Sequence, residues 1–123
     1  MRILAAVAVV IVAVLHLGFL ALEMFFWDHE VGRNIFSMTP EETALTKTLA
    51  ANQGLYNGFL AAGLLWGLIA SKRDVIFFFL LCVMTAGVFG AVTAKPSILF
   101  TQAAPALIAF IFMLFVRPRS AFA

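Results

Sequence analysis

The chain has 123 residues, of which 64% are hydrophobic and 11% are charged. A soluble domain usually carries about 25% charged residues. A soluble domain of 123 residues could not bury so much apolar surface. The composition therefore predicts an integral membrane protein in a lipid bilayer. The formal net charge of +2 is spread over loops and termini without a basic run, which argues against nucleic acid as a partner. The length fits a single domain over residues 1–123.

Four apolar segments follow one another along the chain. We predict helices at residues 3–27, 40–70, 75–94 and 98–116. The second helix is expected to project out of the membrane before Leu49, so the apolar span of each helix is close to the ~20 residues that are needed to cross a hydrocarbon core of ~30 Å. The last two connections are very short, so consecutive helices must run antiparallel. The sequence therefore predicts an all-α integral membrane fold, with four transmembrane helices in an up-down-up-down antiparallel bundle.

The ends of the first two helices can be predicted from local sequence. The apolar run Ile3–Trp27 is longer than the ~7–15 residues of a signal-peptide core, so we expect a retained helix. Thr39, Pro40 and Glu42 have the spacing of a capping box, which predicts that the second helix begins near Pro40. The segment 28–30 (Asp-His-Glu) is interpreted as a solvated loop, because three adjacent residues do not converge on a metal.

Lysine and arginine residues are unevenly distributed between the two predicted sides of the membrane. The side with both termini holds Arg2, Lys72, Arg73, Arg117 and Arg119, whereas the other side holds Arg33, Lys47 and Lys95. Since basic residues favour the cytoplasmic side, we expect both termini in the cytoplasm and the long first connection outside.

Ionisable side chains inside the first apolar segment point to a function. At 100° per residue, His16, Glu23 and Trp27 fall on one stripe of the first helix. The rise of 1.5 Å per residue separates His16 from Glu23 by about 10 Å, so the two cannot pair directly. Ionisable groups within a membrane are costly and usually face a partner, a cavity or a substrate path. His16 and Glu23 are therefore our candidate catalytic residues.

Polar residues of three predicted helices lie at a similar depth. The candidate ligand-binding residues are Trp27, Asn52, Gln53, Tyr56, Asn57 and Gln102. Counting the rise per residue from the predicted outer end, all of them lie with His16 and Glu23 in the outer half of the bundle. We therefore predict one polar site that three helices share, without a metal.

Small and helix-breaking residues predict how these helices pack. Gly54 and Gly58 point away from the polar arc of the second helix and form a Gly-x-x-x-Gly pair, which lets another helix approach closely. Pro105 follows Gln102 in the fourth helix, where a proline frees a backbone carbonyl and can bend the helix.

Each candidate residue also has a structural interpretation. A single Asn or Gln in a span often joins two helices, at about 1 kcal/mol or less. Trp27 fits the aromatic belt at the membrane interface, and Glu23 could reach the headgroups or a lysine. His16 is too deep to reach water, so its alternative role is a hydrogen bond to Tyr56 or to an amide.

Three sequence patterns together resemble a known family. They are His16-x6-Glu23-x3-Trp27, the Ala51–Gly58 segment with its Asn-Gln-Gly-Leu-Tyr-Asn core, and Gln102-x2-Pro105-Ala106. This family is the group of small bacterial membrane proteins called domain of unknown function 1304. The resemblance covers nearly the whole chain. It implies a four-helix integral membrane protein and supplies no activity. With the charge bias, it leads us to expect a multi-pass protein of the bacterial inner (cytoplasmic) membrane.

Three functions are compatible with these observations. We favour a polar site in the outer half of the bundle that binds a small lipid-soluble molecule, with conversion by proton transfer as the enzymatic form of this hypothesis. The alternative is a proton-coupled small-molecule transporter that acts as a dimer, and the third is a structural subunit of a larger membrane complex. The expected partners are the lipid bilayer, a small apolar ligand and, for the transporter, a second copy. The sequence identifies no cofactor.

Overall fold

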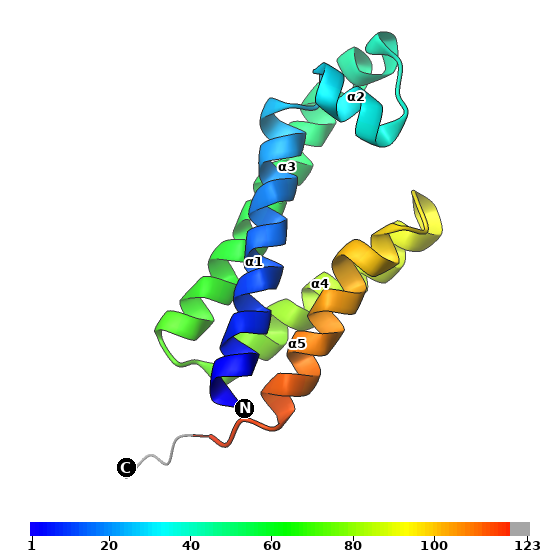
Figure 1. Ribbon diagram of the computed structural model, residues 1–123. Helices are drawn as coiled ribbons and strands as arrows, with labels where there is room; N and C mark the ends of the chain where they lie inside the picture. The colour runs from blue at the N-terminus through cyan, green and yellow to red at the C-terminus, as the bar shows by residue number, and fades with distance from the viewer. Residues whose placement is uncertain (119–123) are drawn as a thin grey trace.

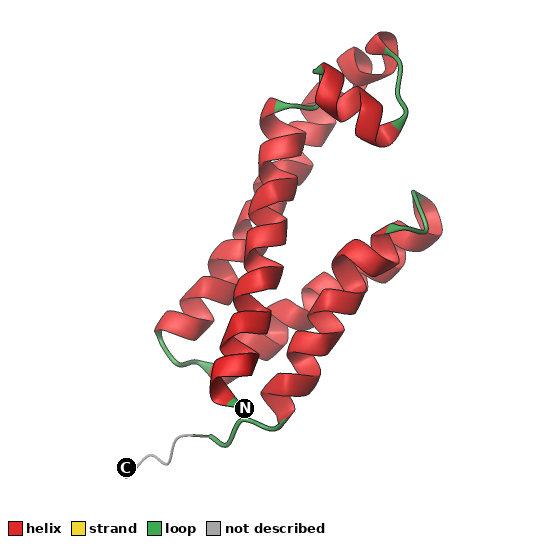
Figure 2. Ribbon diagram, viewed as in Figure 1, coloured by secondary structure: helices red, strands yellow, loops and turns green. Residues whose placement is uncertain are grey.

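The computed structural model describes residues 1–118, which are entirely helical apart from short connections (Figures 1 and 2). This confirms the all-α prediction. The elements are α1 (Arg2–Phe25), α2 (Glu30–Phe36), α3 (Pro40–Ile69), α4 (Arg73–Thr93), a π-helical turn η1 (Leu99–Ala103) and α5 (Ala104–Leu114). Arg119, which contributes to the predicted charge bias, lies outside the described residues.

The long helices alternate in direction and form two antiparallel pairs (Figure 1). One pair consists of α1 and α3, and the other consists of α4 and the η1–α5 segment. The beginning of α1 and the end of α5 lie at one end of the molecule, which we call the terminal end. The short helix α2 lies at the opposite end, which we call the distal end. The two pairs pack together near the terminal end, and their ribbons diverge towards the distal end (Figure 1).

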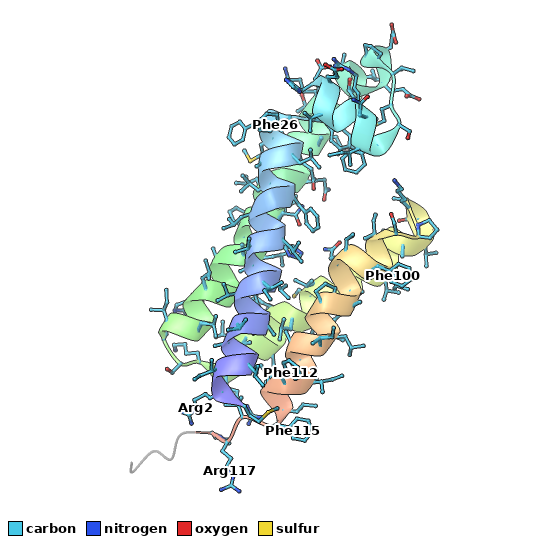
Figure 3. All side chains as sticks on the ribbon, in the orientation of Figure 1. Arg2, Phe26, Phe100, Phe112, Phe115 and Arg117 are labelled. Atoms are coloured by element: carbon cyan, nitrogen blue, oxygen red, sulfur yellow. The ribbon has the colours of Figure 1, made fainter. Side chains whose placement is uncertain are left out.

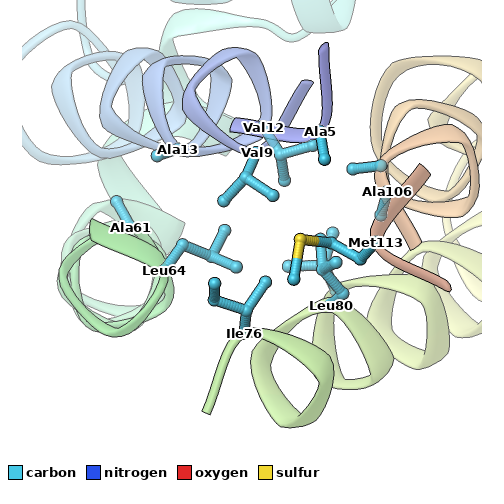
Figure 4. Close-up of a cluster of buried hydrophobic side chains, with 12 residues drawn as sticks. Ala5, Val9, Val12, Ala13, Ala61, Leu64, Ile76, Leu80, Ala106 and Met113 are labelled. Carbon is cyan, nitrogen blue, oxygen red and sulfur yellow. The ribbon is translucent and has the colours of Figure 1, made fainter. Parts of the chain in front are cut away.

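The apolar core lies in the terminal half of the molecule, where all four long helices meet (Figure 4). Val9, Leu64 and Leu80 are fully buried there and come from α1, α3 and α4. The core residues are Ala5, Val9, Val12, Ala13, Ala61, Leu64, Ile76, Leu80, Val83, Ala106, Ala109 and Met113. Most are alanine or valine, whose small side chains let helix backbones approach one another.

Three glycines lie where neighbouring helices approach one another closely. A Cβ atom on Gly54 would lie 2.6 Å from Met24 Cγ and 3.1 Å from the Leu20 carbonyl oxygen, and one on Gly58 would lie 2.6 Å from Leu20 Cδ1. The predicted Gly-x-x-x-Gly contact is therefore present, and its partner is α1. In the second pair, a Cβ on Gly87 would lie 2.7 Å from the backbone nitrogen of Ala103. Backbone atoms lie opposite Gly54 and Gly87, so a Cβ at either position would force the helices apart, whereas the end of the Leu20 side chain opposite Gly58 could move.

The connection after α1 contains a helix that the sequence analysis did not predict. α1 ends at Phe25, so Trp27 lies beyond the helix rather than in it. α2 follows, and the His29 imidazole caps it by accepting a hydrogen bond from the Val31 N–H at 3.1 Å. Gly32 packs directly against the backbone after α1. With seven residues, α2 is too short to show the periodicity from which helices are predicted.

α3 begins at Pro40, as predicted. The Glu42 N–H donates to Thr39 Oγ1 at 3.2 Å, and the Thr39 N–H donates to Glu42 Oε2 at 2.8 Å. This reciprocal pair is the predicted capping box. It satisfies two backbone donors that would otherwise lack a partner at the exposed start of α3.

We expect Thr39→Ala to destabilise the distal end of α3 by about 1 kcal/mol, because it removes the capping oxygen. Thr39→Ser keeps that oxygen and should retain wild-type stability. Hydrogen exchange of the Glu42 amide would report the effect. Equal protection in the alanine and serine variants would show that the capping box contributes nothing.

The fourth predicted helix is divided into two parts. It begins as the π-helical turn η1 and continues as α5 from Ala104, whose N–H bonds to the Leu99 carbonyl five residues earlier. Pro105 has no N–H to donate to the carbonyl of Thr101, which disfavours the α-helical pattern at this point. The wider π turn is a common way for a helix to absorb such an interruption. The sequence therefore predicted the position of the irregularity but not its form.

Two helices in the described part of the chain are long and apolar enough to cross a membrane. They are α1, with a mean hydropathy of 2.9, and α4, with a mean hydropathy of 2.6. The segment Leu99–Leu114 is apolar but shorter. α3 has 30 residues but contains the amides of Asn52, Gln53 and Asn57, which lower its hydropathy.

Candidate functional site

His16 is fully buried and makes two contacts that fix its orientation. Its Nδ1 lies 2.8 Å from the carbonyl oxygen of Val12, and its Nε2 lies 3.3 Å from Nε2 of Gln102. Because a carbonyl only accepts hydrogen bonds, Nδ1 carries the proton and donates it to Val12. Nε2 then accepts from the Gln102 amide. The ring therefore joins α1 to η1, in the neutral tautomer with its proton on Nδ1.

Glu23 pairs with α3 rather than with a lysine. Asn57 Nδ2 donates a hydrogen bond to Glu23 Oε1 at 2.8 Å, and both side chains are half-buried. Within residues 1–118, Oε2 of Glu23 has no hydrogen-bond partner. Leu20 lies between the two polar pairs on the same stripe of α1 and packs on Gly58. The site thus consists of two hydrogen-bonded pairs, His16–Gln102 and Glu23–Asn57, on either side of this leucine.

Trp27 closes the distal side of the site. Its Nε1–H donates to Thr46 Oγ1 at 2.9 Å, and Thr46 in turn donates to the Glu42 carbonyl at 2.7 Å. The indole ring also packs on Phe36 of α2, with 5.0 Å between ring centroids. Trp27 is therefore half-buried and fixed between α2 and α3, so it connects α1 to both of these helices.

Three of the predicted ligand-binding residues lie apart from these pairs. Asn52, Gln53 and Tyr56 are exposed, and Tyr56 has 53% of its surface accessible. Asn52 donates only to the Thr48 carbonyl of its own helix. Since Gly54 faces α1, residues two positions away point about 200° around the helix from that contact. The structure thus pairs His16 with Gln102 and Glu23 with Asn57, holds Trp27 against α3 through Thr46, and leaves Asn52 and Tyr56 on the opposite face of α3.

Thr43 and Thr46, which were not predicted as site residues, hold the segment after α1 to α3 at the distal end. Thr43 is fully buried and donates to Asp28 Oδ1 at 2.9 Å, and Asp28 also forms an ion pair with Arg33 at 3.0 Å. The segment around Asp28 is therefore held to α3 rather than merely solvated. The spacing of Thr39, Thr43 and Thr46 places them on one face of a helix, and this pattern could have identified them.

The chemistry of the site follows from the accessibility of each group. His16 is enclosed, so it cannot touch a substrate in this arrangement and can act only by orienting Gln102. Glu23 is half-buried with one oxygen unengaged, so it can accept a hydrogen bond or a proton from a bound molecule. Within residues 1–118, no three or more His, Cys, Asp or Glu side chains are grouped so that they could hold a metal ion.

Comparison with known proteins establishes which family this is. The chain belongs to the family described as "Protein of unknown function (DUF1304)", whose sequence model matches residues 10–114. It is similar to the uncharacterized protein YpaA of Lactococcus lactis subsp. lactis (strain IL1403), with 28% identity over 115 residues that cover 90% of this chain and 97% of that protein. No solved structure matches the chain. The resemblance inferred from the sequence motifs is therefore confirmed.

Proposed function

We propose that the chain crosses the bacterial inner membrane four times, through α1, α3, α4 and the η1–α5 segment, with both termini in the cytoplasm. The high hydropathy of α1 and α4 supports this proposal, because in both helices less than a third of the most apolar window is buried within the chain. Such apolar exposure favours contact with lipid. The terminal end also carries Arg2, Lys72, Arg73 and Arg117, in agreement with the expected bias.

In this proposed membrane arrangement, the pairs His16–Gln102 and Glu23–Asn57 form a site for a small lipid-soluble molecule with a hydroxyl group that can donate a hydrogen bond to Glu23. The observation that carries this function is the Glu23 carboxyl group, which one amide holds in place and which keeps a second oxygen unengaged. A carboxyl group in a membrane segment is costly unless it has a partner or a role. Glu23 and Asn57 would contact the molecule, and His16 would hold Gln102 in position. Proton transfer by Glu23 is the enzymatic form of this proposal.

The transporter function remains the second candidate, and one observation favours it. Asn52, Gln53 and Tyr56 are exposed, and Asn52 and Tyr56 lie on the face of α3 that points away from α1. Polar groups exposed to lipid are unfavourable, and a second copy of the chain could cover them. Proton uptake by liposomes on addition of a transported substrate would support this candidate.

Native mass spectrometry of the protein released gently from its own membrane tests the binding site. We expect the wild type to retain a small molecule that Glu23→Gln loses, because the amide presents a donor to the ligand where the carboxylate accepts. Glu30→Gln is the matched control, since Glu30 is an exposed glutamate of α2, and it should retain the molecule. Equal occupancy in Glu23→Gln and wild type would overturn the proposed site.

A further inference from the structure

A second polar feature lies at the terminal end, away from the site around Glu23. A partly open pocket of about 200 Å³ is formed there where the ends of α1, α3, α4 and α5 meet. Its polar lining consists of three arginines, Arg2, Arg73 and Arg117, together with Ser71. Arg2 and Arg117 are visible on this end in Figure 3. The rest of the lining is formed by Ala6, Leu68, Ile76, Met113, Val116 and Pro118, all apolar.

The guanidinium group of Arg73 is fixed in the wall of this pocket. Its Nη2 donates to the Met113 carbonyl at 3.1 Å and lies 3.4 Å from the Leu114 carbonyl, so it also supports the end of α5. The group lies over the ring of Phe77, 5.0 Å from the ring centroid. Its Nε atom is buried and has no hydrogen-bond partner among the described residues. A buried donor without a partner is costly, so the Arg73 guanidinium keeps hydrogen-bonding capacity that the described residues do not use.

The arginines of the pocket are not neutralised by acidic side chains. No aspartate or glutamate lines the pocket, and the ion pair found within residues 1–118 joins Arg33 to Asp28 at the distal end. Arg2 instead donates to the backbone carbonyl of Arg117 at 3.3 Å, which holds the start of the chain beside the end of α5. Three arginines around a pocket without acidic side chains form a favourable environment for an anion, and arginine suits phosphate oxygens in particular.

We propose that this pocket binds the phosphate group of an acidic phospholipid from the cytoplasmic leaflet, with the lipid's acyl chains against the apolar wall. This proposal rests on the membrane placement proposed above. Basic pockets between membrane helices on the cytoplasmic side are suited to acidic headgroups. The volume is below the roughly 300–1,000 Å³ of typical ligand pockets, so it suits a headgroup rather than a whole lipid. The six apolar lining residues distinguish the site from one for free phosphate, which would need polar groups on all sides.

Native mass spectrometry of the full chain in detergent tests the proposal, with equal amounts of dioleoyl phosphatidylglycerol and dioleoyl phosphatidylcholine added. We expect phosphatidylglycerol to bind at least about fivefold better, since one basic residue near a membrane surface contributes about this factor. Arg117→Gln should remove most of this preference. Arg2→Gln should do the same if Arg117→Gln alone disturbs folding. Lys72→Gln is the matched control, because Lys72 is a cation at the same end that does not line the pocket.

Four results would overturn the proposal, and they do so in different ways. Equal binding of the two lipids, or a preference that survives both arginine substitutions, would show that there is no headgroup site. Displacement of phosphatidylglycerol by glycerol 3-phosphate alone would show that a free phosphate ester is the ligand. Extraction of the native protein from membranes by alkaline carbonate would overturn the membrane placement and this proposal with it. Retention of the protein in the membrane with unselective lipid binding would overturn only the lipid site.

Discussion

Replacing Gly87 by alanine is expected to lower the free energy of unfolding by about 2–3 kcal/mol, at the upper end of the usual cost of overpacking. The added Cβ would lie 2.7 Å from the nitrogen, 2.8 Å from Cβ and 3.0 Å from Cα of Ala103. These are mostly backbone atoms, and they cannot rotate aside as the end of a long side chain can. α4 and η1 would have to move apart, and this movement would also displace Gln102, the neighbour of Ala103.

Gly18→Ala is the matched control for this substitution. Gly18 lies within α1, but a Cβ there would have no atom within 4 Å. Alanine is favoured over glycine in a helix by roughly 0.5–1 kcal/mol, so this variant should be slightly more stable than wild type. Thermal unfolding in detergent, followed by circular dichroism, would measure both variants. If the two substitutions changed stability equally, the close approach of α4 to η1 would be wrong.

His16→Ala is expected to cost about 3 kcal/mol, comparable to the loss of other large buried side chains. The side chain is fully buried, and its removal would leave a cavity beside Phe19, which packs edge-on against the imidazole ring at 5.2 Å between centroids. It would also leave the amide of Gln102 without its acceptor. His16→Leu fills the volume without the hydrogen bonds, so the difference between these two variants separates the packing cost from the hydrogen-bonding cost.

His29→Ala provides the comparison with an exposed histidine. His29 caps α2 through one hydrogen bond, so its replacement should cost about 1 kcal/mol or less. Chemical unfolding in mixed micelles would rank the variants, and we expect His16→Ala to be the least stable of the three. A His16→Ala protein as stable as His29→Ala would contradict the enclosed position of His16 between α1 and η1.

The features of the fold that could be predicted from the sequence are those that depend on local chemistry. The helical class follows from long apolar segments, and the start of α3 follows from the capping chemistry of Thr39 and Glu42, which needs no tertiary contact. α2 was missed because its seven residues are stabilised by contacts with other elements, such as the close packing of Gly32. The π turn was missed because the proline indicates that the helix is interrupted but not how the backbone compensates.

The contacts among the candidate site residues could be predicted only in part, for a geometric reason. The stripe on α1 was sufficient to select His16 and Glu23, but their partners depend on how α3 is rotated about its axis. Gly54 and Gly58 determine that rotation, because they pack on α1 and thereby turn Asn52 and Tyr56 to the opposite face. Asn57 lies next to Gly58 at the edge of the contact and therefore reaches Glu23. The glycine pair thus contained the information that would have separated Asn57 from the other polar residues.

The π-helical turn uncouples the identity of the side chain that faces His16 from the register of the core residues in α5. The turn Leu99–Ala103 contains one more residue per turn than an α-helix would, and Gln102 lies within it, whereas Ala106, Ala109 and Met113 follow it in regular α5. Loss of that extra residue would restore an α-helix and rotate the segment before α5 by about 100°, while the core residues kept their register. Insertions and deletions at this turn can therefore exchange the side chain that faces His16 while the core residues of α5 keep their register, although the contact of η1 with α4 through Gly87 and Gly90 would have to adjust.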